Sequence, residues 1–346
     1  MTKDKRERPA TQVVTLKELA EHVGLTKGTV SAVLNESPSS KAIPQHTKDR
    51  ILAAARELNY RPNFFARSLR KKRTYTVGVI TEEIGDPYGG MVISGAEAFL
   101  SEQKYFFLTV AHRHDANLLQ QYAGILVSRG VEGIITVDTS LSQTLPVPAV
   151  AIAGHKRVKG VTNIVLDHTR AAHLALEHLF ELGHRDIAFV RGQPFSSDSA
   201  DRWRAIEKTA AEIGIRIRPE LTVQLDKDDP SPMHGHALVK NLMSRKHSFT
   251  ALFAYNDISA IGAIRAILEA GLRVPEDVSV VGFDDIRDAA YHVPSLTTVR
   301  QPLRKMGEIA AQSLVERIEG RKEYPTEIAI EPELVVREST GRVRSS

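Results

Sequence analysis

Residues 63–73, NFFARSLRKKR, place large apolar side chains inside the most basic run of the chain. Cations at this density suit phosphate groups, and an apolar side chain among them suits insertion between stacked bases in a DNA minor groove. If the segment is a helix that begins at Asn63, Phe65 and Leu69 share one face and Arg67 lies on another. We therefore predict that Leu69 is an apolar wedge. The alternative is an amphipathic linker whose phenylalanines pack onto the rest of the protein.

A second set of short or cationic side chains recurs between residues 26 and 35. Hydroxyl, amide and ammonium donors suit phosphates and base edges, whereas DNA would repel a carboxylate. The donors are Thr26, Lys27, Thr29, Ser31 and Asn35, and the first acidic residue after them is Glu36. The pattern favours a nucleic-acid-binding face on one helix.

Three short helices can position these donors. Thr15 and Glu18 form a capping-box pair at the start of the first helix, which Gly24 can end. Thr26 is the expected N-cap of the second helix, and the third begins near Pro44. The apolar positions expected to face inward are Leu16, Leu19, Ala20, Val23, Val30, Val33, Leu34, Ile51, Ala54, Ala55 and Leu58. Two helices joined by a tight turn and braced by a third predict a helix-turn-helix domain, with another three-helix bundle as the alternative.

The charge of the chain is uneven. Residues 1–74 contain 16 lysines and arginines against 7 acidic residues, a net charge of +9, whereas the whole chain carries only +4 and the remainder therefore −5. A basic head on a mildly acidic body suggests that the head meets nucleic acid or an anionic membrane. No apolar leader or membrane-length apolar stretch is visible, and the chain has no cysteine, so we expect a cytoplasmic protein.

Residues 75–340 alternate short apolar runs with helical segments, which predicts parallel βαβ units. Eight strands in two sets of four would form two doubly wound lobes. Ligands of such sheets bind at the carboxyl ends of the strands. The residues expected there are Asp86, Pro87, Tyr88, Asp138, Gln193, Asn256, Asp257, Asp284 and Asp285. We expect Asp257 and Asp285 to cap the helices that follow them.

Six motifs give the chain a resemblance to the LacI/GalR family of bacterial transcription regulators. They are TLKELAEHVGLTKGTVSAVLN, ELNYRPNFFARSLR, ALFAYNDISAIGAI, VPEDVSVVGFDDI, LTTVRQP and ELVVREST, in the family's order. The resemblance implies an α/β protein with an all-α helix-turn-helix head and a two-lobed body of doubly wound parallel sheets, like the periplasmic binding proteins. It also implies a homodimer on a palindromic double-stranded DNA operator, controlled by a small-molecule effector.

The resemblance divides the chain into three parts. Residues 13–61 form the helix-turn-helix DNA-binding domain, 62–74 the hinge helix and linker, and 75–340 the effector-binding and dimerisation domain. Lobe 1 is expected at about 75–163 and 292–322, and lobe 2 at about 164–291 and 323–340.

The resemblance also implies site residues. Those for DNA are Thr15, Leu16, Thr26, Lys27, Gly28, Thr29, Ser31, Ala32, Asn35, Asn63, Ala66, Arg67 and Leu69. Those for the effector are Pro87, Tyr88, His155, Arg202, Asn256, Phe283 and Asp284. Gly28 and Ala32 depart from the longer polar side chains often found at base-reading positions, so Lys27 and Leu69 are expected to carry more of the operator's identity.

Several points stay open in the sequence. Pro230 and Ala153 stand where some members have a sugar-stacking aromatic and an acidic residue, so a sugar effector is compatible but not required. No P-loop or metal-spaced histidine cluster is present, and we expect no catalysis, cofactor or metal. A binding protein or sugar enzyme with the same body, or an architectural DNA binder, are the other classes. The segment after Ser339 lacks a leucine heptad, which disfavours a tetramerising coiled coil.

Overall fold

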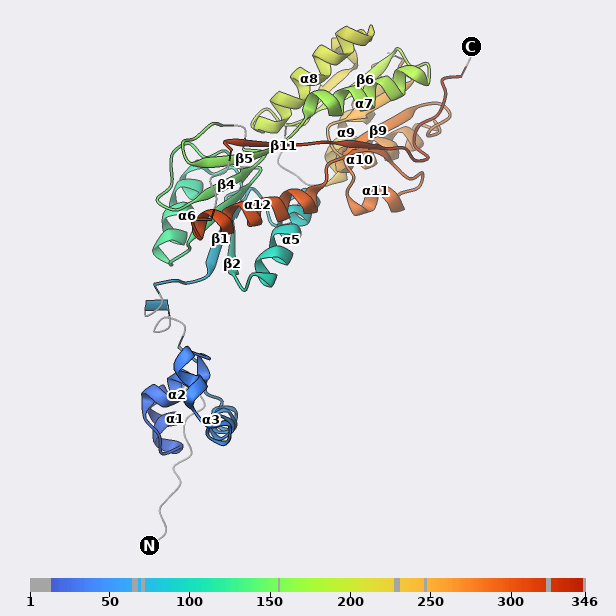
Figure 1. Ribbon diagram of the computed structural model, residues 1–346. Helices are drawn as coiled ribbons and strands as arrows, with labels where there is room; N and C mark the ends of the chain where they lie inside the picture. Colours follow the sequence, from blue (N-terminus) through green and yellow to red (C-terminus); the bar gives the residue numbers. More distant parts are fainter. Residues whose placement is uncertain are drawn as a thin grey trace. The chain divides into compact units, whose positions relative to one another are not determined.

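The computed structural model divides the chain into two compact units, residues 1–74 and 75–346 (Figure 1). The structure describes residues 14–63, 68–69, 72–154, 156–226, 231–245, 248–321 and 325–344. None of the helices in these ranges is long and apolar enough to cross a membrane. Each unit is built around its own hydrophobic core, so each is described by itself.

The first unit holds the three predicted helices, α1 (Leu16–His22), α2 (Lys27–Leu34) and α3 (Gln45–Glu57). The predicted capping box is confirmed, because the Thr15 hydroxyl accepts a hydrogen bond from the Glu18 amide at 3.3 Å and the Glu18 carboxylate accepts one from the Thr15 amide at 2.8 Å. Leu19, Val30 and Ile51, one from each helix, are fully buried and form the centre of the core.

The connection between α2 and α3 contains a 3-10 helix, η1 (Pro38–Ala42). The Arg50 guanidinium on α3 donates a hydrogen bond to the carbonyl of Val23, at the turn between α1 and α2, at 3.1 Å. This contact braces the helix-turn-helix pair against α3.

The second unit contains two six-stranded sheets. The first comprises β1 (Thr76–Thr81), β2 (Phe106–Ala111), β3 (Gly133–Val137), β4 (Ala149–Ile152), β5 (Val161–Leu166) and β11 (Glu327–Ile330), in the order β11-β5-β4-β3-β1-β2, all parallel. Helices α5 (Pro87–Glu102) and α12 (Leu303–Ile318) share one hydrophobic cluster with it, and α6 (Ala116–Ser128) packs against another. Near-continuous burial of β1, β3 and β4 is what a sheet covered on both faces requires.

The second sheet comprises β6 (Ile187–Arg191), β7 (Thr222–Gln224), β8 (Ala251–Ala254), β9 (Ser279–Asp284), β10 (Thr297–Arg300) and β12 (Glu333–Val335). Only β12 runs antiparallel, against β10. Helices α7 (His168–Glu181) and α8 (Ser197–Ile213) pack with one cluster, and α9 (Pro232–Ser244) and α10 (Asp257–Glu269) with the other. The short helices η2 (Pro219–Leu221) and α11 (Arg287–Tyr291) complete this lobe.

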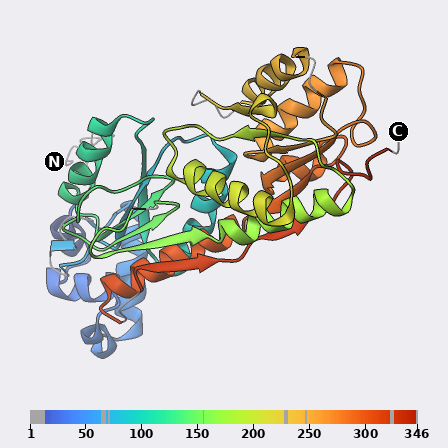
Figure 2. The same ribbon diagram turned by 90° about the horizontal axis from the view of Figure 1, so that it is seen from above.

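The chain crosses between the two sheets three times. It crosses at Asp167 after β5, at Gln301 and Pro302 after β10, and at Glu331 and Pro332 after β11. Figure 2 shows the C-terminal part of the chain, in red, passing through both lobes. Each lobe is therefore assembled from segments that precede and segments that follow the other lobe.

Two sequence predictions about the lobes are wrong. All eight predicted strands are present, but each sheet has six strands rather than four. The predicted lobe boundaries also fail, because β10 pairs with β9 in the second sheet and β11 pairs with β5 in the first. The crossing into the first lobe comes after the strand TTVR and not before it. Both strands have only four residues, too few for their apolar pattern to identify a partner.

The helix pair α5 and α12 is packed unusually closely. A Cβ atom on Gly95 would lie 1.9 Å from the carbonyl oxygen of Arg304, and one on Gly307 would lie 1.9 Å from the carbonyl oxygen of Val92. Only glycine allows the two backbones to meet at this distance. The first lobe is thus locked together across segments about 200 residues apart in sequence.

Candidate functional site

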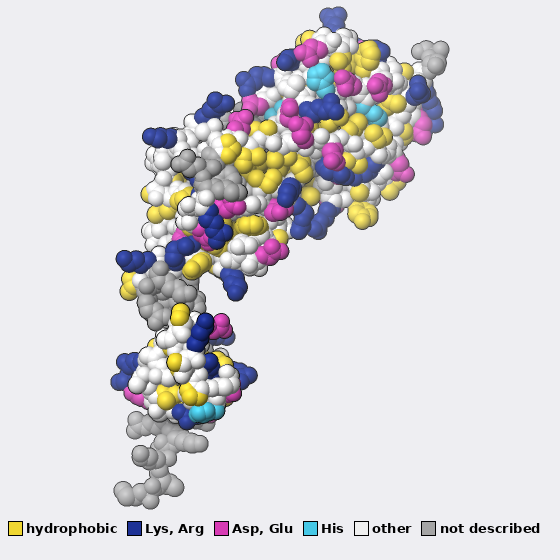
Figure 3. All heavy atoms as spheres, viewed as in Figure 1, with side chains coloured by type: hydrophobic (Ala, Val, Ile, Leu, Met, Phe, Trp, Pro, Cys, Tyr) yellow, Lys and Arg dark blue, Asp and Glu magenta, His cyan; other side chains and the backbone are white. Residues whose placement is uncertain are grey.

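The exposed face of α2 presents the side chains predicted to contact DNA. Thr26, Lys27 and Gly28 are exposed, whereas Val30 and Val33 face the core. Thr29, Ser31, Ala32 and Asn35 are half-buried. Figure 3 shows basic side chains spread over the surface of this unit among acidic and apolar ones. The first turn of α2 is therefore its most accessible part.

Hydrogen bonds within α2 hold several of these polar groups in place. The Thr26 hydroxyl accepts from the Thr29 amide at 3.1 Å and lies 2.9 Å from the Thr29 hydroxyl. The Asn35 amide donates to the Ser31 carbonyl at 2.7 Å. Lys27 makes no hydrogen bond or ion pair with the residues that the structure describes, and its ammonium group is therefore available to a ligand.

Space remains open beside Gly28. A Cβ atom there would meet nothing closer than the Thr26 hydroxyl at 3.7 Å. The backbone of the first turn can therefore approach a flat surface, such as a base edge, without a side chain between them. A glycine is therefore compatible with the base-reading role predicted for this position.

The predicted hinge segment is described only in part. Ser68 and Leu69 are helical, and the Leu69 side chain is 83% exposed. Asn63 is also exposed. Ala66, Arg67 and the two phenylalanines lie outside the described residues. An exposed leucine of this kind is what a wedge requires, because a side chain already packed in a core could not enter DNA.

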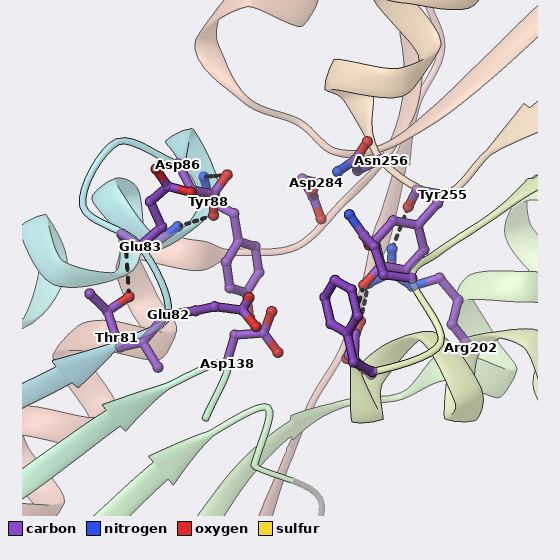
Figure 4. A pocket seen from close by; sticks show the side chains of 16 residues that line it. Thr81, Glu82, Glu83, Asp86, Tyr88, Asp138, Arg202, Tyr255, Asn256 and Asp284 are labelled. Atoms are coloured by element: carbon purple, nitrogen blue, oxygen red, sulfur yellow. Dashed lines mark hydrogen bonds and ion pairs between the residues drawn. The ribbon is translucent and has the colours of Figure 1, made fainter. Parts of the chain in front are cut away.

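In the second unit a cavity of about 790 Å³, counting its open mouth, lies where the carboxyl ends of both sheets meet (Figure 4). The predicted effector residues that line it are Tyr88, Arg202, Asn256 and Asp284. Three other residues that the carboxyl-end rule predicted also line it, Asp86, Asp138 and Gln193. The sequence therefore predicted the location of the cavity and about half of its lining.

Two predicted effector residues, Pro87 and Phe283, are not in the lining. Pro87 is the first residue of α5 and precedes the lining residue Tyr88. Phe283 is fully buried behind Arg202, whose guanidinium carbon lies 3.6 Å from the centre of its ring. His155 lies outside the described residues. Phe283 can therefore act on a ligand only through Arg202.

Arg202 is held on every side by groups of the second lobe. It forms an ion pair with Asp198 one turn earlier on α8, and it donates a hydrogen bond to the carbonyl of Tyr255. The rings of Tyr255 and Phe283 lie 4.4 and 3.6 Å from its guanidinium carbon. The His168 Nε2 atom donates a hydrogen bond to the Asp198 carboxylate at 2.9 Å. Arg202 is only 4% exposed, and this network fixes its position before any ligand arrives.

Asp284 extends into the cavity from the end of β9. Its φ angle is 109° and that of Asp285 is 56°, so the chain turns sharply there. Burial raises the pKa of Asp284 well above the usual range, although Arg202 opposes this shift. Gln301, at a crossover between the lobes, donates a hydrogen bond to Asp284 at 2.7 Å. Asp284 therefore connects the cavity directly to the crossover.

The prediction that Asp257 and Asp285 cap helices is wrong. Asn256 caps α10, accepting from the Ser259 amide at 2.9 Å, and Figure 4 shows its amide nitrogen turned toward Asp284. Asp257 is fully buried and accepts from the Thr298 hydroxyl at 2.6 Å and the Ile286 amide at 2.9 Å. Asp285 forms ion pairs with two arginines, Arg300 and Arg337. Long-range partners, which sequence does not reveal, outcompete the local cap.

Burial raises the pKa of Asp257 from 3.8 to about 7, and its hydrogen bonds only partly offset this. Because the pKa of Asp257 is higher in the folded than in the unfolded state, the free energy of unfolding falls as the pH rises. The contribution of Asp257 is fully present below about pH 4 and is lost by about pH 7. One pKa unit corresponds to about 1.4 kcal/mol, so the full loss is roughly 4 kcal/mol. We expect Asp257→Asn to remove this part of the pH dependence, which urea unfolding at pH 5 and pH 8 would measure. An equal change of unfolding free energy in wild type and variant would contradict this expectation.

Sequence reasoning missed several lining residues. Asp198 and Tyr255 hold Arg202, and Phe195 and Glu82 lie at opposite sides of the cavity. A contact between the lobes joins the latter two, since His114 lies 2.5 Å from Glu82 and its ring centre lies 4.2 Å from that of Phe195. The signal for Asp198 was present, because a carboxylate four residues before an arginine shares its helix face.

Comparisons with known proteins agree with this division. Residues 15–63 match the family model "Bacterial regulatory proteins, lacI family", and residues 176–340 match "Periplasmic binding protein-like domain". The HTH-type transcriptional repressor PurR of Yersinia enterocolitica serotype O:8 / biotype 1B is 32% identical over 338 residues, 95% of this chain and 97% of that protein.

Solved structures give the same result. The Lac repressor dimer bound to operator and the anti-inducer ONPF is 27% identical, with a TM-score of 0.84 over 95% of this chain and 100% of that one. The complex of the transcriptional regulator CelR with cellobiose is 29% identical, with a TM-score of 0.69 over 94% of this chain and 99% of that one. The similarity covers both units rather than one.

Proposed function

The chain belongs to the lacI family of bacterial regulatory proteins, and we propose that it is a transcriptional repressor that binds a palindromic operator as a homodimer under the control of a small-molecule effector. It acts in the cytoplasm and has no enzymatic activity in this proposal. The observation that carries it is the pairing of an exposed polar helix, α2, with a polar cavity in a separate unit of the same chain.

A two-fold dimer follows from the size of the reading surface. One α2 helix with a few accessible donors buries too little area for tight, specific binding. Two copies related by two-fold symmetry would read two half-sites, so the operator is a palindrome. Leu69 from each subunit would enter the minor groove between the half-sites.

Two crossovers carry hydrogen bonds to residues of the cavity, which supports a route for effector control. Gln301 bonds to Asp284, and His168, the first residue after the crossover at Asp167, bonds to Asp198. A ligand that competes for Asp284 or displaces Arg202 would change these bonds and hence the angle between the lobes. In a dimer, that angle sets the spacing of the paired hinge segments and shifts the equilibrium between DNA-competent and incompetent states.

The test is a selection of bound genomic fragments with purified full-length protein at near-physiological salt. We expect a shared palindrome with a flexible pyrimidine–purine step at its centre, because such steps are the easiest to unstack. Enrichment without a shared sequence would favour the alternative of an architectural DNA binder. A protein of residues 75–346 alone should lose DNA retention, and retention that survived this truncation would argue against the helix-turn-helix proposal.

Lys27 is expected to carry part of the operator preference. Lysine pairs with the acceptors on a guanine edge, and such a contact discriminates between bases by about 1–3 kcal/mol. Lys27→Ala should therefore reduce the ratio of operator to random-DNA affinity by roughly 10- to 100-fold. Competition binding at fixed salt measures this ratio, and Arg56→Ala on α3 serves as the control, since Arg56 bonds only to its own helix among the described residues. An equal loss of affinity for operator and random DNA would indicate that Lys27 contacts a phosphate rather than a base.

A further inference from the structure

One contact beside the cavity joins the two lobes through a pair of aromatic rings. His114 lies between β2 and α6 of the first lobe, and the centre of its ring lies 4.2 Å from that of Phe195, which follows β6 in the second lobe. We propose that His114 and Phe195 form an interlobe latch, which holds the lobes in the arrangement of this structure and so sets the equilibrium on which an effector acts. The latch itself is a property of the body, and only its effect on operator binding rests on the proposed function.

The backbone holds the His114 ring in a fixed position. Arg113 and His114 have φ angles of 47° and 57°, a left-handed conformation that residues other than glycine adopt at a cost in free energy. The amide of Arg113 donates a hydrogen bond to the carbonyl of Glu82 at 2.9 Å, and Asp115 caps α6 directly after the turn. Such a turn persists only where its surroundings hold it, so the ring is presented by a firmly positioned backbone.

A hydrogen bond also fixes the plane of the His114 ring. Its Nδ1 atom lies 2.5 Å from the Glu82 carboxylate, and the two side chains are only 22% and 21% exposed. Because an ionised carboxylate only accepts, the proton of this bond is on Nδ1. The ring of Phe195 is tilted by 54° from that of His114, within the range that aromatic pairs prefer. The first lobe therefore offers an oriented surface on which Phe195 rests.

Phe195 connects the latch to the helix that carries Arg202. The next residue, Ser196, is the N-cap of α8, and its hydroxyl accepts a hydrogen bond from the Ser199 amide at 3.3 Å. The same hydroxyl lies 3.3 Å from the hydroxyl of Tyr255, which lines the cavity. A displacement of Phe195 would therefore reach the first turn of α8 and the groups that surround Arg202.

The latch lies far from the crossovers in both sheets. Strand β2 is one edge of the first sheet, whereas β5 and β11, from which two crossovers leave, are at the other. In the second sheet β8 and β9 separate β6 from β10 and β12, where crossovers begin and end. Met91 also packs against the cores of both lobes, but its helix α5 packs along α12, which begins at a crossover. Rotation of the lobes about the crossovers would therefore strain the latch strongly, because its lever arm is long.

Spin labels would measure the arrangement of the lobes directly. The chain has no cysteine, so Ser128→Cys on α6 and Glu207→Cys on α8 introduce the only labelling sites, and both positions are exposed. Full-length protein with both nitroxide labels is diluted with an excess of unlabelled protein, so that distances within one chain dominate. Double electron–electron resonance without DNA or effector then gives the distribution of distances between the lobes.

We expect one main distance in the labelled protein with an intact latch. His114→Asn and Phe195→Ala should increase the population at other distances by about two- to tenfold, the worth of one aromatic pair. Arg113→Asn is the matched control, because it changes the same turn without removing a ring, and asparagine tolerates the positive φ at both positions. Phe195→Tyr keeps the ring and should keep the original distribution. Latch variants that are folded by circular dichroism and indistinguishable from Arg113→Asn would overturn the proposal.

The double variant tests whether the two residues act through one contact. It should shift the lobe equilibrium no further than either single variant, and additive shifts would overturn the latch. The affinity of the same effector-free variants for the selected operator then tests the consequence. We expect His114→Asn and Phe195→Ala to change this affinity in the same direction and by a similar factor. A changed distance distribution with an unchanged operator affinity would support the latch and contradict the proposed route of effector control instead.

Discussion

Replacing Leu69 by alanine is expected to weaken operator binding by roughly 10- to 100-fold, equivalent to about 1.4–2.8 kcal/mol, while random-DNA binding changes by less than about threefold. The Leu69 side chain is 83% exposed, so its removal creates no cavity in the described part of the protein. The cost arises only where the side chain enters a base step, and that requires the paired arrangement on an operator. Competition binding with operator and scrambled DNA at the same salt concentration measures the difference.

Leu69→Met is the matched control, because methionine keeps apolar reach at a similar volume. It should retain most of the operator preference that alanine loses. Equal losses on operator and scrambled DNA with Leu69→Ala would contradict the wedge and return the segment to the role of an amphipathic linker.

The second large effect concerns the ion pair between Arg202 and Asp198 in the cavity lining. Replacing Arg202 by methionine is expected to lower the free energy of unfolding of the second unit by about 3–5 kcal/mol, because Asp198 is then left buried without its cation. Asp198 would keep its contact with His168 but lose its cation. Urea unfolding followed by circular dichroism measures the loss.

Two variants separate this loss from a general effect of arginine removal. Arg204→Met lies on the same helix, but Arg204 is exposed and pairs with Asp201 at the surface, so its loss should be below about 1 kcal/mol. The double variant Arg202→Met, Asp198→Asn should recover much of the stability, since no buried charge remains. A double variant no more stable than Arg202→Met would mean that packing of the arginine, rather than charge pairing, dominates.

Local chemistry made much of this architecture predictable from sequence. The capping pairs of Thr15 and Thr26 lie within three residues of their partners, so the sequence alone predicted where α1 and α2 begin. The rule that ligands meet the carboxyl ends of parallel strands predicted Tyr88, Asp138 and Asp284 in the cavity lining. These predictions depend on short distances along the chain or on a property of all such sheets.

The wrong predictions have one physical cause. Contacts with residues far away in the sequence determine where these side chains and strands lie. Asp257 follows a strand as a helix cap would, but Thr298 and Ile286 bind it in the core. Strand β10 (TTVR) belongs to the second sheet because it pairs with β9. Strand β11 (EIAI) belongs to the first sheet because it pairs with β5. Phe283 was predicted to bind the effector, but its ring lies behind the guanidinium of Arg202. No spacing pattern in the sequence contains these contacts.

The threefold crossing of the chain between the sheets has a consequence for how such proteins can be recombined. Residues 1–74 form a contiguous unit, so a single junction between two genes exchanges the whole DNA-binding part. Neither lobe of the body can be exchanged in this way, because β11 joins the first sheet after β10 has completed a crossing through the second, and β12 then returns to the second sheet. Chimeras joined near residue 74 should therefore fold and acquire a new operator, whereas chimeras joined inside the body would need three matched junctions at once. Operator choice and effector choice can diversify separately, but the two lobes are inherited together.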